Sequence, residues 1–403
     1  MTQKQLVPKR RFEGFMGDWK EIKLGEVAEF NPNSTLPDVF KYVDLESVIG
    51  TEIVSYRTEF KRSAPSRAQR LAVSGDIFYQ TVRPYQKNNY LYDLPYNNFV
   101  FSTGYAQMRP DINGYFLLSL IQEEKFVMKV LNRCTGTGYP AINSNDLANI
   151  EIRVPNDRKE QQKIGQFFKH LDEMIALQQR KLDNTKALKS AYLAEMFPVE
   201  GERVPKRRFA GFTEEWKKFR LDDIAIYRRG SFPQPYGKEY WYDETDGQPF
   251  VQVVDVGKNF KLVDNTKQKI SKLAQQYSVF VEEGKVLVTL QGSIGRVAIT
   301  QYPSYVDRTI LIFENYKLDV NKEYFAYVVQ MLFEIEKLKA PGGTIKTITK
   351  EALSEFLIHL PDIKEQQKIG QFFKHLDEMI ATHQQKLEKL KATKQAYLHE
   401  MFV

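Results

Sequence analysis

The chain has 403 residues, with 58 lysines and arginines against 51 aspartates and glutamates, and a single cysteine. This length favours two to three domains, and a composition of 42% hydrophobic and 13% aromatic residues excludes a wholly disordered chain. The lone Cys134 excludes a disulfide framework and a structural cysteine–zinc cluster. No apolar run approaches the roughly 20 residues that cross a bilayer, and the charged start of the chain lacks the apolar part of a secretion signal. The sequence therefore predicts a soluble, cytoplasmic protein.

The net charge of +7 and the isoelectric point near 9.0 favour a polyanionic partner. The positive charge is uneven, however, because residues 29–153 and 226–359 are close to neutral. A prediction of nucleic-acid binding must therefore depend on local clusters of cations and on the organisation of the chain, not on its net charge.

Two blocks of the sequence occur twice. VPKRRFEGF at 7–15 recurs as VPKRRFAGF at 204–212, and KEQQKIGQFFKHLDEMIA occupies both 159–176 and 364–381. The stretches between these blocks share little beyond their pattern. Repeated parts predict contacts with the same partner surface twice, whereas the two unlike parts predict contacts with two different targets.

The repeat divides the chain into six segments. They are a repeated amino-terminal segment (1–28), a first variable domain (29–153), a long helix (154–198), a linker with the second copy of the repeated segment (199–225), a second variable domain (226–359) and a second long helix (360–403). Both variable domains contain β-branched or aromatic strand patterns, such as 76–82 and 285–290, and helical patterns at 115–132 and 321–339. Each is therefore predicted to be a mixed α/β unit.

The two long helices carry a heptad pattern after Pro155 and Pro361. The predicted seam consists of Ile164, Phe168, Leu171, Ile175 and Leu182 in the first helix and of Ile369, Phe373, Leu376, Ile380 and Leu387 in the second. Two such helices in one chain pair most simply as an antiparallel coiled coil. The predicted fold class is thus α+β, with two mixed α/β domains separated by a long antiparallel two-helix coiled coil in a pseudo-twofold internal repeat.

Several residues modify this seam. Gln178 and His383 share one seam position, and Lys189 and Lys394 share another. They are either half-exposed polar residues or residues that fix the register and orientation of the helices. Four further apolar residues extend the apolar face of the helices beyond the seam: Phe167, Met174, Phe372 and Met379. This wider apolar face predicts that a further protein packs against the helices.

Enzyme motifs are missing from the sequence. There is no phosphate-binding loop of the form G-x-x-x-x-G-K-[ST], and Gly136-Thr-Gly138 lacks the strand and helix of a dinucleotide site. Glu283 and Lys285 supply only half of a nuclease motif. His170 and His375 have no histidine or cysteine one helical turn away, so no metal site is predicted. The chain is predicted to be non-catalytic by itself.

Candidate DNA-contacting residues gather in loop-like stretches of both variable domains, because arginine, asparagine and glutamine read base edges while lysine and arginine hold phosphates. They are Arg57, Lys61, Arg62, Arg67, Arg70, Arg83, Gln86, Lys87 and Asn88 in the first domain and Arg228, Arg229, Gln234, Lys238, Lys258, Lys261, Gln291, Ser293, Arg296 and Lys346 in the second. Any one cluster is also typical of a solvated surface, but both domains contain such loops. The repeated Pro-Lys-Arg-Arg segment has three possible roles: it binds DNA phosphates, it contacts the common partner protein, or it packs onto the long helices.

The order of two unlike domains and two near-identical helical regions, together with local motifs, resembles the specificity subunit of type I DNA restriction–modification systems. The most specific motif is the Glu-Gln-Gln-Lys-Ile helix start after a proline. Gly75-Asp-Ile-Phe78 and the run GSIGRVAI at 292–299 also match the family. Gly284-Lys285 departs from it, because the family pattern has Gly-Asp there.

The resemblance implies that the variable domains are target-recognition domains, each reading one half of a bipartite site in double-stranded DNA. It also implies assembly with two methyltransferase subunits and, in the full complex, with restriction subunits. S-adenosylmethionine, ATP and magnesium are then expected on those partners only. Two alternatives stay open, a coiled-coil protein–protein scaffold without sequence-specific DNA binding and a nuclease centred on Glu283 and Lys285.

Overall fold

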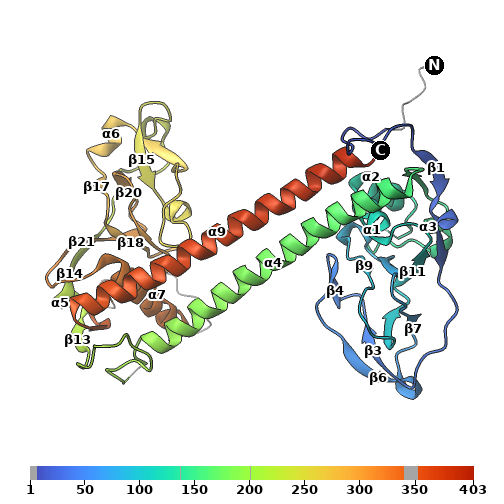
Figure 1. Cartoon of the computed structure of the whole chain (residues 1–403). Helices are drawn as coiled ribbons and strands as arrows, with labels where there is room; N and C mark the ends of the chain where they lie inside the picture. The colour runs from blue at the N-terminus through green and yellow to red at the C-terminus, as the bar shows by residue number, and fades with distance from the viewer. Residues whose placement is uncertain (1–6, 137, 200, 340–352) are drawn as a thin grey trace. The chain divides into compact units, whose positions relative to one another are not determined.

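The computed structural model describes residues 7–136, 138–199, 201–339 and 353–403, without the side chains of 337–339 (Figure 1). The chain divides into two compact units, each containing one variable domain and one half of each long helix. Unit 1 comprises Met1–Arg180 with Gln385–Val403, and unit 2 comprises Lys181–Gln384. None of the helices in the described ranges is long and apolar enough to span a membrane.

The two long helices are α4 (Arg158–Met196) and α9 (Ile363–Met401), drawn in green and red in Figure 1. Both begin behind an aspartate whose carboxylate accepts a backbone N–H of the first turn. Lys159 N donates to Asp157 Oδ1 at 2.8 Å, and Lys364 N donates to Asp362 Oδ1 at the same distance. Each contact satisfies an N–H group that has no partner inside the helix.

The helices pair antiparallel within each unit, as the heptad pattern predicts. In unit 1, Phe167 near the start of α4 contacts Tyr397 near the end of α9, with ring centroids 4.9 Å apart. In unit 2 the order is reversed, since Tyr192 near the end of α4 contacts Phe372 near the start of α9 at 5.0 Å. Eight of the ten predicted seam residues are buried, and Ile175 and Ile380 are half-buried.

The first variable domain contains two four-stranded sheets and a set of short helices. One sheet has the order β2 (Ala28–Phe30), β11 (Tyr105–Pro110), β8 (Ile77–Gln80), β9 (Tyr90–Leu91), and the other has the order β6 (Arg57–Phe60), β3 (Val39–Val43), β10 (Phe99–Ser102), β7 (Ala68–Leu71). A hairpin of β4 (Val48–Ile49) and β5 (Glu52–Ile53) and helices α1 (Gly114–Gln122), α2 (Glu124–Leu131) and α3 (Ser144–Ala148) complete it. Phe78 and Phe101 stack between the sheets with centroids 3.6 Å apart.

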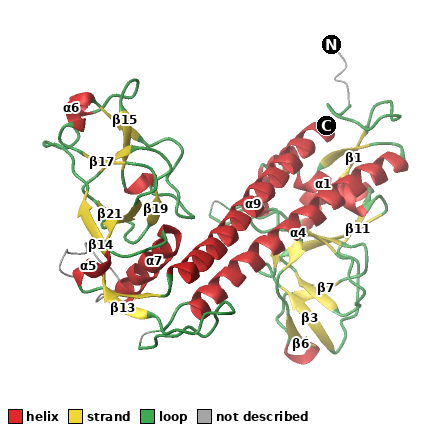
Figure 2. Ribbon diagram, turned by 60° about the vertical axis from the view of Figure 1, so that its left-hand side comes forward, coloured by secondary structure: helices red, strands yellow, loops and turns green. Residues whose placement is uncertain are grey.

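The second variable domain repeats this arrangement with other residues. Its sheets have the orders β14 (Ala225–Arg229), β21 (Ile310–Tyr316), β18 (Val286–Thr289), β19 (Val297–Ile299) and β16 (Gln268–Ile270), β15 (Gln248–Val251), β20 (Ser304–Val306), β17 (Val279–Val281). Its described residues include helices α6 (Lys272–Gln275) and α7 (Lys322–Lys339), and the short helix α5 (Leu221–Ile224) directly precedes β14. Figure 2 shows these strands in yellow.

The two four-stranded sheets of one variable domain therefore match those of the other strand for strand, whereas the β4–β5 hairpin has no counterpart among the described strands of the second domain. We call the sheets that contain β3 and β15 the outer sheets, and those that contain β8 and β18 the inner sheets. Each outer sheet holds a single parallel pair, β3 with β10 and β15 with β20, flanked by antiparallel neighbours. Each inner sheet pairs its last strand with two antiparallel neighbours in the same order. The sequence predicted a common strand-rich class for the two domains but not this correspondence, because the side chains on the shared backbone differ.

One predicted helix is wrong in its extent. The pattern at 115–132 predicts one helix, but the structure breaks it at Glu123, whose backbone is extended. The Glu123 carboxylate accepts the backbone N–H groups of Lys125 and Phe126 and thereby starts α2. An N-cap inside an apolar periodic stretch explains why the period alone misses the break.

The repeated segments close each unit around a buried tryptophan. β1 (Lys20–Lys23) pairs with β12 (Glu151–Val154), and β13 (Lys217–Arg220) pairs with β22 (Leu357–Leu360). Trp19 packs on Phe402, directly after α9, and Trp216 packs on Phe197, directly after α4. The invariant parts of the two units thus build the same junction between variable domain and helices.

Candidate nucleic-acid interface

One backbone hydrogen bond marks the same position in both variable domains. Thr81 N donates to Gly104 O at 3.0 Å in the first domain, and Leu290 N donates to Thr309 O at 2.8 Å in the second. In the first domain, this hydrogen bond joins the loop after β8 to the turn after β10. In the second domain, it joins the loop after β18 to the turn after β20. We call this region the hairpin end, comprising residues 81–89 and 103–104 in the first domain and 290–296 and 307–309 in the second.

In the first domain, the hairpin end contains the predicted Arg83, Gln86, Lys87 and Asn88. Three of them are held by the protein: Gln86 accepts from Gln80 Nε2 at 2.8 Å, Lys87 pairs with Glu124 at 2.6 Å, and Asn88 Oδ1 accepts from Gly50 N at 2.9 Å. Arg83 instead lies over the ring of Tyr139, 4.2 Å from its centroid. Arg83 is thus the cation of this loop most suited to contact a ligand.

In the second domain, the equivalent loop contains the predicted Gln291, Ser293 and Arg296, all exposed. Gln234 and Lys238 are also exposed and lie in the stretch after β14. Tyr236, between them in sequence, donates its hydroxyl to Asp307 Oδ2 at 3.2 Å. The structure therefore connects two stretches that the sequence presented separately.

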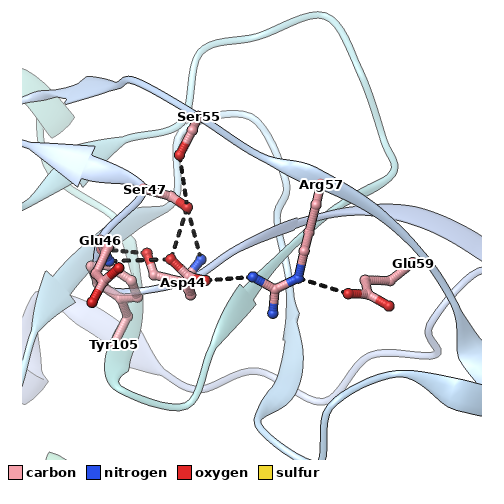
Figure 3. Close-up of polar contacts among 7 residues, drawn as sticks. All are labelled: Asp44, Glu46, Ser47, Ser55, Arg57, Glu59 and Tyr105. Atoms are coloured by element: carbon pink, nitrogen blue, oxygen red, sulfur yellow. Dashed lines mark hydrogen bonds and ion pairs between the residues drawn. The ribbon is translucent and has the colours of Figure 1, made fainter.

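Figure 3 shows that the Arg57 side chain forms ion pairs with two acidic residues. Its guanidinium lies 2.7 Å from both Asp44 and Glu59. Burial of Asp44 acts to raise its pKa, but hydrogen bonds from Ser47, Arg57 and the backbone of Glu46 outweigh burial and lower it. The Arg57 charge is balanced within the domain, which opposes a phosphate contact at this residue.

The cation cluster of 57–70 is split between opposite ends of the outer sheet. Lys61 and Arg62 follow β6, next to the start of β3, and Lys61 N donates to Asp38 O at 2.9 Å. Arg67 lies at the hairpin end, since its carbonyl accepts from Thr103 N at 2.8 Å. Arg70 lies between, on β7. Burial lowers the pKa of Arg70, and its Nε has no hydrogen-bond acceptor in the described part of the chain.

In the second domain, the remaining predicted cations also divide. Arg228 and Arg229 end β14 beside the start of β21, and Arg228 pairs with Glu314 at 3.3 Å. Lys258 and Lys261 lie at the other end of β19, because Phe260 O accepts from Ile299 N at 2.9 Å. There they line a cavity of about 400 Å³ together with residues of α9. Lys346 lies outside the described residues.

Gly284-Lys285, where the family pattern has Gly-Asp, reverses the charges of two facing residues relative to the first domain. In the first domain, Asp76 is fully buried and accepts from Arg109 Nε at 2.8 Å and from Gln107 at 2.7 Å. The sheet register aligns Asp76 with Lys285 and Arg109 with Glu314. Lys285 Nζ donates to the Glu314 carbonyl at 2.6 Å, so the position links the same two strands with the opposite charge.

The repeated Pro-Lys-Arg-Arg segments dock onto the helices, one of the three roles considered for them. Arg11 binds Glu160 through two hydrogen bonds of 2.7 and 2.8 Å, and Arg208 binds Glu365 through two of 2.6 and 2.8 Å. These carboxylates are at most 1% exposed, so the contacts fix the segments in place.

The same segments cover part of the apolar face that the sequence analysis assigned to a further protein. The ring of Phe12 contacts Phe167 at 5.8 Å, and Phe209 contacts Phe372 at 5.9 Å. Phe167 and Phe372 are therefore half-buried, partly by these segments of the same chain. Met174 and Met379 stay 41% and 36% exposed.

Sequence reasoning missed Arg308 at the second hairpin end, and it missed the tyrosines beside the two hairpin ends, Tyr139 and Tyr236. Arg308 lies over the ring of Tyr236, 5.5 Å from its centroid, in the turn between β20 and β21. The only signal in the sequence is an isolated arginine between two strand-like runs. A lone charge in a turn is common, so the pattern did not single it out.

Comparisons with known proteins agree with this architecture. The family model for the type I restriction modification DNA specificity domain matches residues 16–186 and again residues 213–392. The HindI type I restriction enzyme specificity subunit of Haemophilus influenzae is 21% identical over 73% of this chain and 79% of its own length. The putative type I restriction enzyme MjaX specificity subunit of Methanocaldococcus jannaschii is 21% identical over 72% of this chain and 68% of its own length.

Solved structures show the same fold. The S subunit of a type I restriction-modification system from M. genitalium aligns with a TM-score of 0.67 at 14% identity, covering 98% of this chain and 99% of that one. A chain from a structural study of type I assembly and conformational transition aligns with a TM-score of 0.53 at 24% identity, covering 95% and 97%. With two matching domains on one polypeptide, the chain belongs to the family of type I restriction–modification DNA specificity subunits.

Proposed function

We propose that this specificity subunit is non-catalytic by itself and that each variable domain reads one half of a bipartite site in double-stranded DNA. One observation carries the proposal: two domains of one topology present different polar side chains at their equivalent hairpin ends. Arg83 and Gln86 lie at the first, and Gln291, Ser293 and Arg308 lie at the second. Two half-sites of different sequence require different hydrogen-bonding groups on comparable scaffolds.

The paired helices are proposed to act as the spacer and to dock two methyltransferase subunits. Exposed side chains that recur identically in both units support this part. They are Gln166, His170, Glu173 and Met174 on α4 and Gln371, His375, Glu378 and Met379 on α9. Packing inside the chain does not require identity at exposed positions, whereas two copies of one partner do.

The chemistry is proposed to belong to the partners. S-adenosylmethionine would bind to the methyltransferase subunits, and ATP with magnesium would bind to restriction subunits in the full complex. This chain would then contribute the choice of sequence and the geometry of assembly. Restriction subunits are part of the proposal because the family is that of restriction–modification systems.

DNA reading is tested by titrating the chain, assembled with its methyltransferase partner, against duplexes at several salt concentrations. The proposal expects a selected bipartite duplex to bind at least 1,000-fold more tightly than shuffled duplexes, with affinity falling steeply as salt rises. Equal and salt-independent binding of both duplexes would instead favour the protein–protein scaffold.

Docking is tested by a matched pair of double variants. Met174→Asp with Met379→Asp changes two exposed side chains and should reduce capture of the methyltransferase subunit while leaving the melting temperature unchanged. Phe168→Asp with Phe373→Asp places charges at two fully buried seam positions. This variant should lower both the capture of the methyltransferase subunit and the melting temperature. Full capture by the methionine variant would place the docking surface elsewhere.

A further inference from the structure

In each variable domain, an arginine without a carboxylate partner among the described residues lies over a tyrosine ring at the hairpin end. Arg83 lies 4.2 Å from the centroid of Tyr139, and Arg308 lies 5.5 Å from that of Tyr236. The two pairs come from different segments. Arg83 belongs to the loop after β8, whereas Arg308 belongs to the turn after β20. Two unlike sequences have therefore produced the same kind of contact, from different segments, at the corresponding ends of the two domains.

The equivalence follows from the backbone hydrogen bond that marks the hairpin end. Arg83 is two residues after the donor Thr81, and Arg308 is one residue before the acceptor Thr309. The tyrosines stay accessible, with Tyr139 66% and Tyr236 41% exposed. Both guanidinium groups thus lie at the surface of the same end of their domains.

Neither guanidinium is neutralised by the protein. Across residues 7–136, 138–199, 201–339 and 353–403, no carboxylate pairs with Arg83 or Arg308, and neither side chain donates a hydrogen bond. Other arginines of these domains differ: Arg57 and Arg109 both bind carboxylates. The nitrogen donors of the two stacked arginines are therefore available to an external acceptor.

Both pairs are also held in advance of any ligand. The Tyr236 hydroxyl donates to Asp307 Oδ2 and accepts from Gln252 Nε2 at 2.7 Å. Arg83 is fixed through its backbone, since its N–H donates to Pro140 O at 2.8 Å beside Tyr139. An arginine whose position is set before binding loses less conformational freedom when it forms hydrogen bonds.

The backbone conformation of Arg83 is a second observation that points to a role for its side chain. Its φ is 54°, in the left-handed region that favours glycine. The equivalent residue of the second domain, two positions after Leu290, is Gly292 with φ 66°. A residue with a Cβ is strained in this conformation, whereas glycine is not. Strained residues of this kind concentrate where the side chain has a function.

We propose that Arg83 and Arg308 each read a guanine, one in each half of the bipartite site. Arginine donates two parallel hydrogen bonds to the N7 and O6 acceptors of guanine, and no other base offers that pair in the major groove. The tyrosine ring supports the flat face of the guanidinium and leaves its edge for the base. This inference rests on the proposed reading of half-sites by the variable domains.

The test uses the full chain assembled with its methyltransferase partner and a library of duplexes with randomised bases. Methylated molecules are selected and sequenced, which gives the recognised motif. Arg83→Gly should relax one guanine position in one half of the motif by roughly 10- to 100-fold and leave the other half unchanged. Arg308→Lys should relax one guanine position in the other half, since lysine keeps the charge but loses the two-pronged contact.

The variants are chosen to stay folded. Glycine at position 83 adopts the conformation that Gly292 already has, so Arg83→Gly should melt at or above the wild-type temperature. Arg57→Gln is the matched control, because Arg57 is an exposed arginine bound to two carboxylates, and it should leave the motif unchanged.

Two outcomes would overturn the inference. Unchanged motifs in both variants would show that the stacked pairs read no base. Equal weakening on all sequences, with the salt dependence of affinity reduced by about one ion, would show phosphate contacts instead. Failure of the proposed function itself looks different, since the wild-type complex would then yield no bipartite motif at all.

Discussion

The ammonium of Lys189 lies 2.6 Å from Oδ1 of Asp377, and Lys394 repeats this contact with Asp172 at 2.5 Å. Each pair joins α4 to α9 within its own unit, and both lysines hold the same position of the repeat. Lys189 is 18% and Asp377 7% exposed, so this charge pair is largely buried. Polar seam residues that find a partner only in one alignment fix the register and direction of the helices. The structure thus favours the register role considered for these lysines.

Replacing Lys189 by methionine should destabilise unit 2. The change leaves the Asp377 carboxylate buried with the Tyr327 hydroxyl as its remaining donor. We expect a loss of about 2 kcal/mol, because removal of one partner strands a largely buried charge. Urea unfolding measures the loss, and Lys186→Met, at an exposed position of the same helix, is the control. Equal midpoints for the two variants would remove the register role.

Alanine at Gly165 should also destabilise the fold. The added Cβ would lie 2.9 Å from Phe116 N, at the first turn of α1, where Asn113 caps the helix. Gly370 repeats this close approach at 2.8 Å from Tyr324 N. Forcing α1 away from α4 should cost about 2 kcal/mol. Gly138→Ala, with open space around its Cβ, should leave the thermal midpoint unchanged. A Gly165→Ala protein as stable as this control would contradict the close packing.

Two neighbouring arginines should differ in their effect on stability. Arg11→Met strands Glu160, which is 1% exposed, and should cost about 3 kcal/mol. Arg10→Met removes an exposed ion pair with Glu400 and a contact with the ring of Tyr397, and should destabilise the fold much less than Arg11→Met does. Chemical denaturation of both variants measures the difference. Similar losses for the two would mean that the repeated segment does not depend on its buried contact.

The free energy of unfolding should depend on pH through His359. Burial, with Lys218 and Arg203 nearby, lowers the pKa of His359 below its usual 6.5. Because the unfolded chain then binds more protons, the contribution of His359 to stability is complete above pH 6.5 and is lost as the pH falls through the lowered value. Wild-type protein should lose more stability between pH 7.5 and 5.5 than His359→Gln. His170→Gln, at a position 82% exposed, should behave as wild type. Parallel pH profiles for wild type and His359→Gln would contradict the assignment.

The long helices could be predicted from the sequence because their signal is periodic and local. The heptad positions from Ile164 to Leu182 and from Ile369 to Leu387 specify both the helix and its buried side. The two identical blocks also indicated that the same junction is built twice. The docking of Arg11 on Glu160 was only one of three open roles, since a cationic segment carries no information on which carboxylate it meets.

The candidate reading sites could be predicted only in part. Arg83, Gln86 and Gln291 lie in loops that follow strands, so composition and position identified them. The stacked pairs could not be found in this way, because Arg83 meets Tyr139 from 56 residues away and Arg308 meets Tyr236 from 72. Such contacts depend on the three-dimensional course of four segments, two for each pair. Lys258 and Lys261 were grouped with the reading loops by charge alone, and the structure places them at the other end of their hairpin.

The division of reading between the two variable domains is tested most directly by exchanging one of them. Residues 29–153 are replaced by the corresponding domain of another specificity subunit, and the methylated motif is read by sequencing the DNA of cells that express the chimera with its methyltransferase. The account predicts that one half of the motif changes to that of the donor while the other half is retained. A motif that changes in both halves, or in neither, would contradict it.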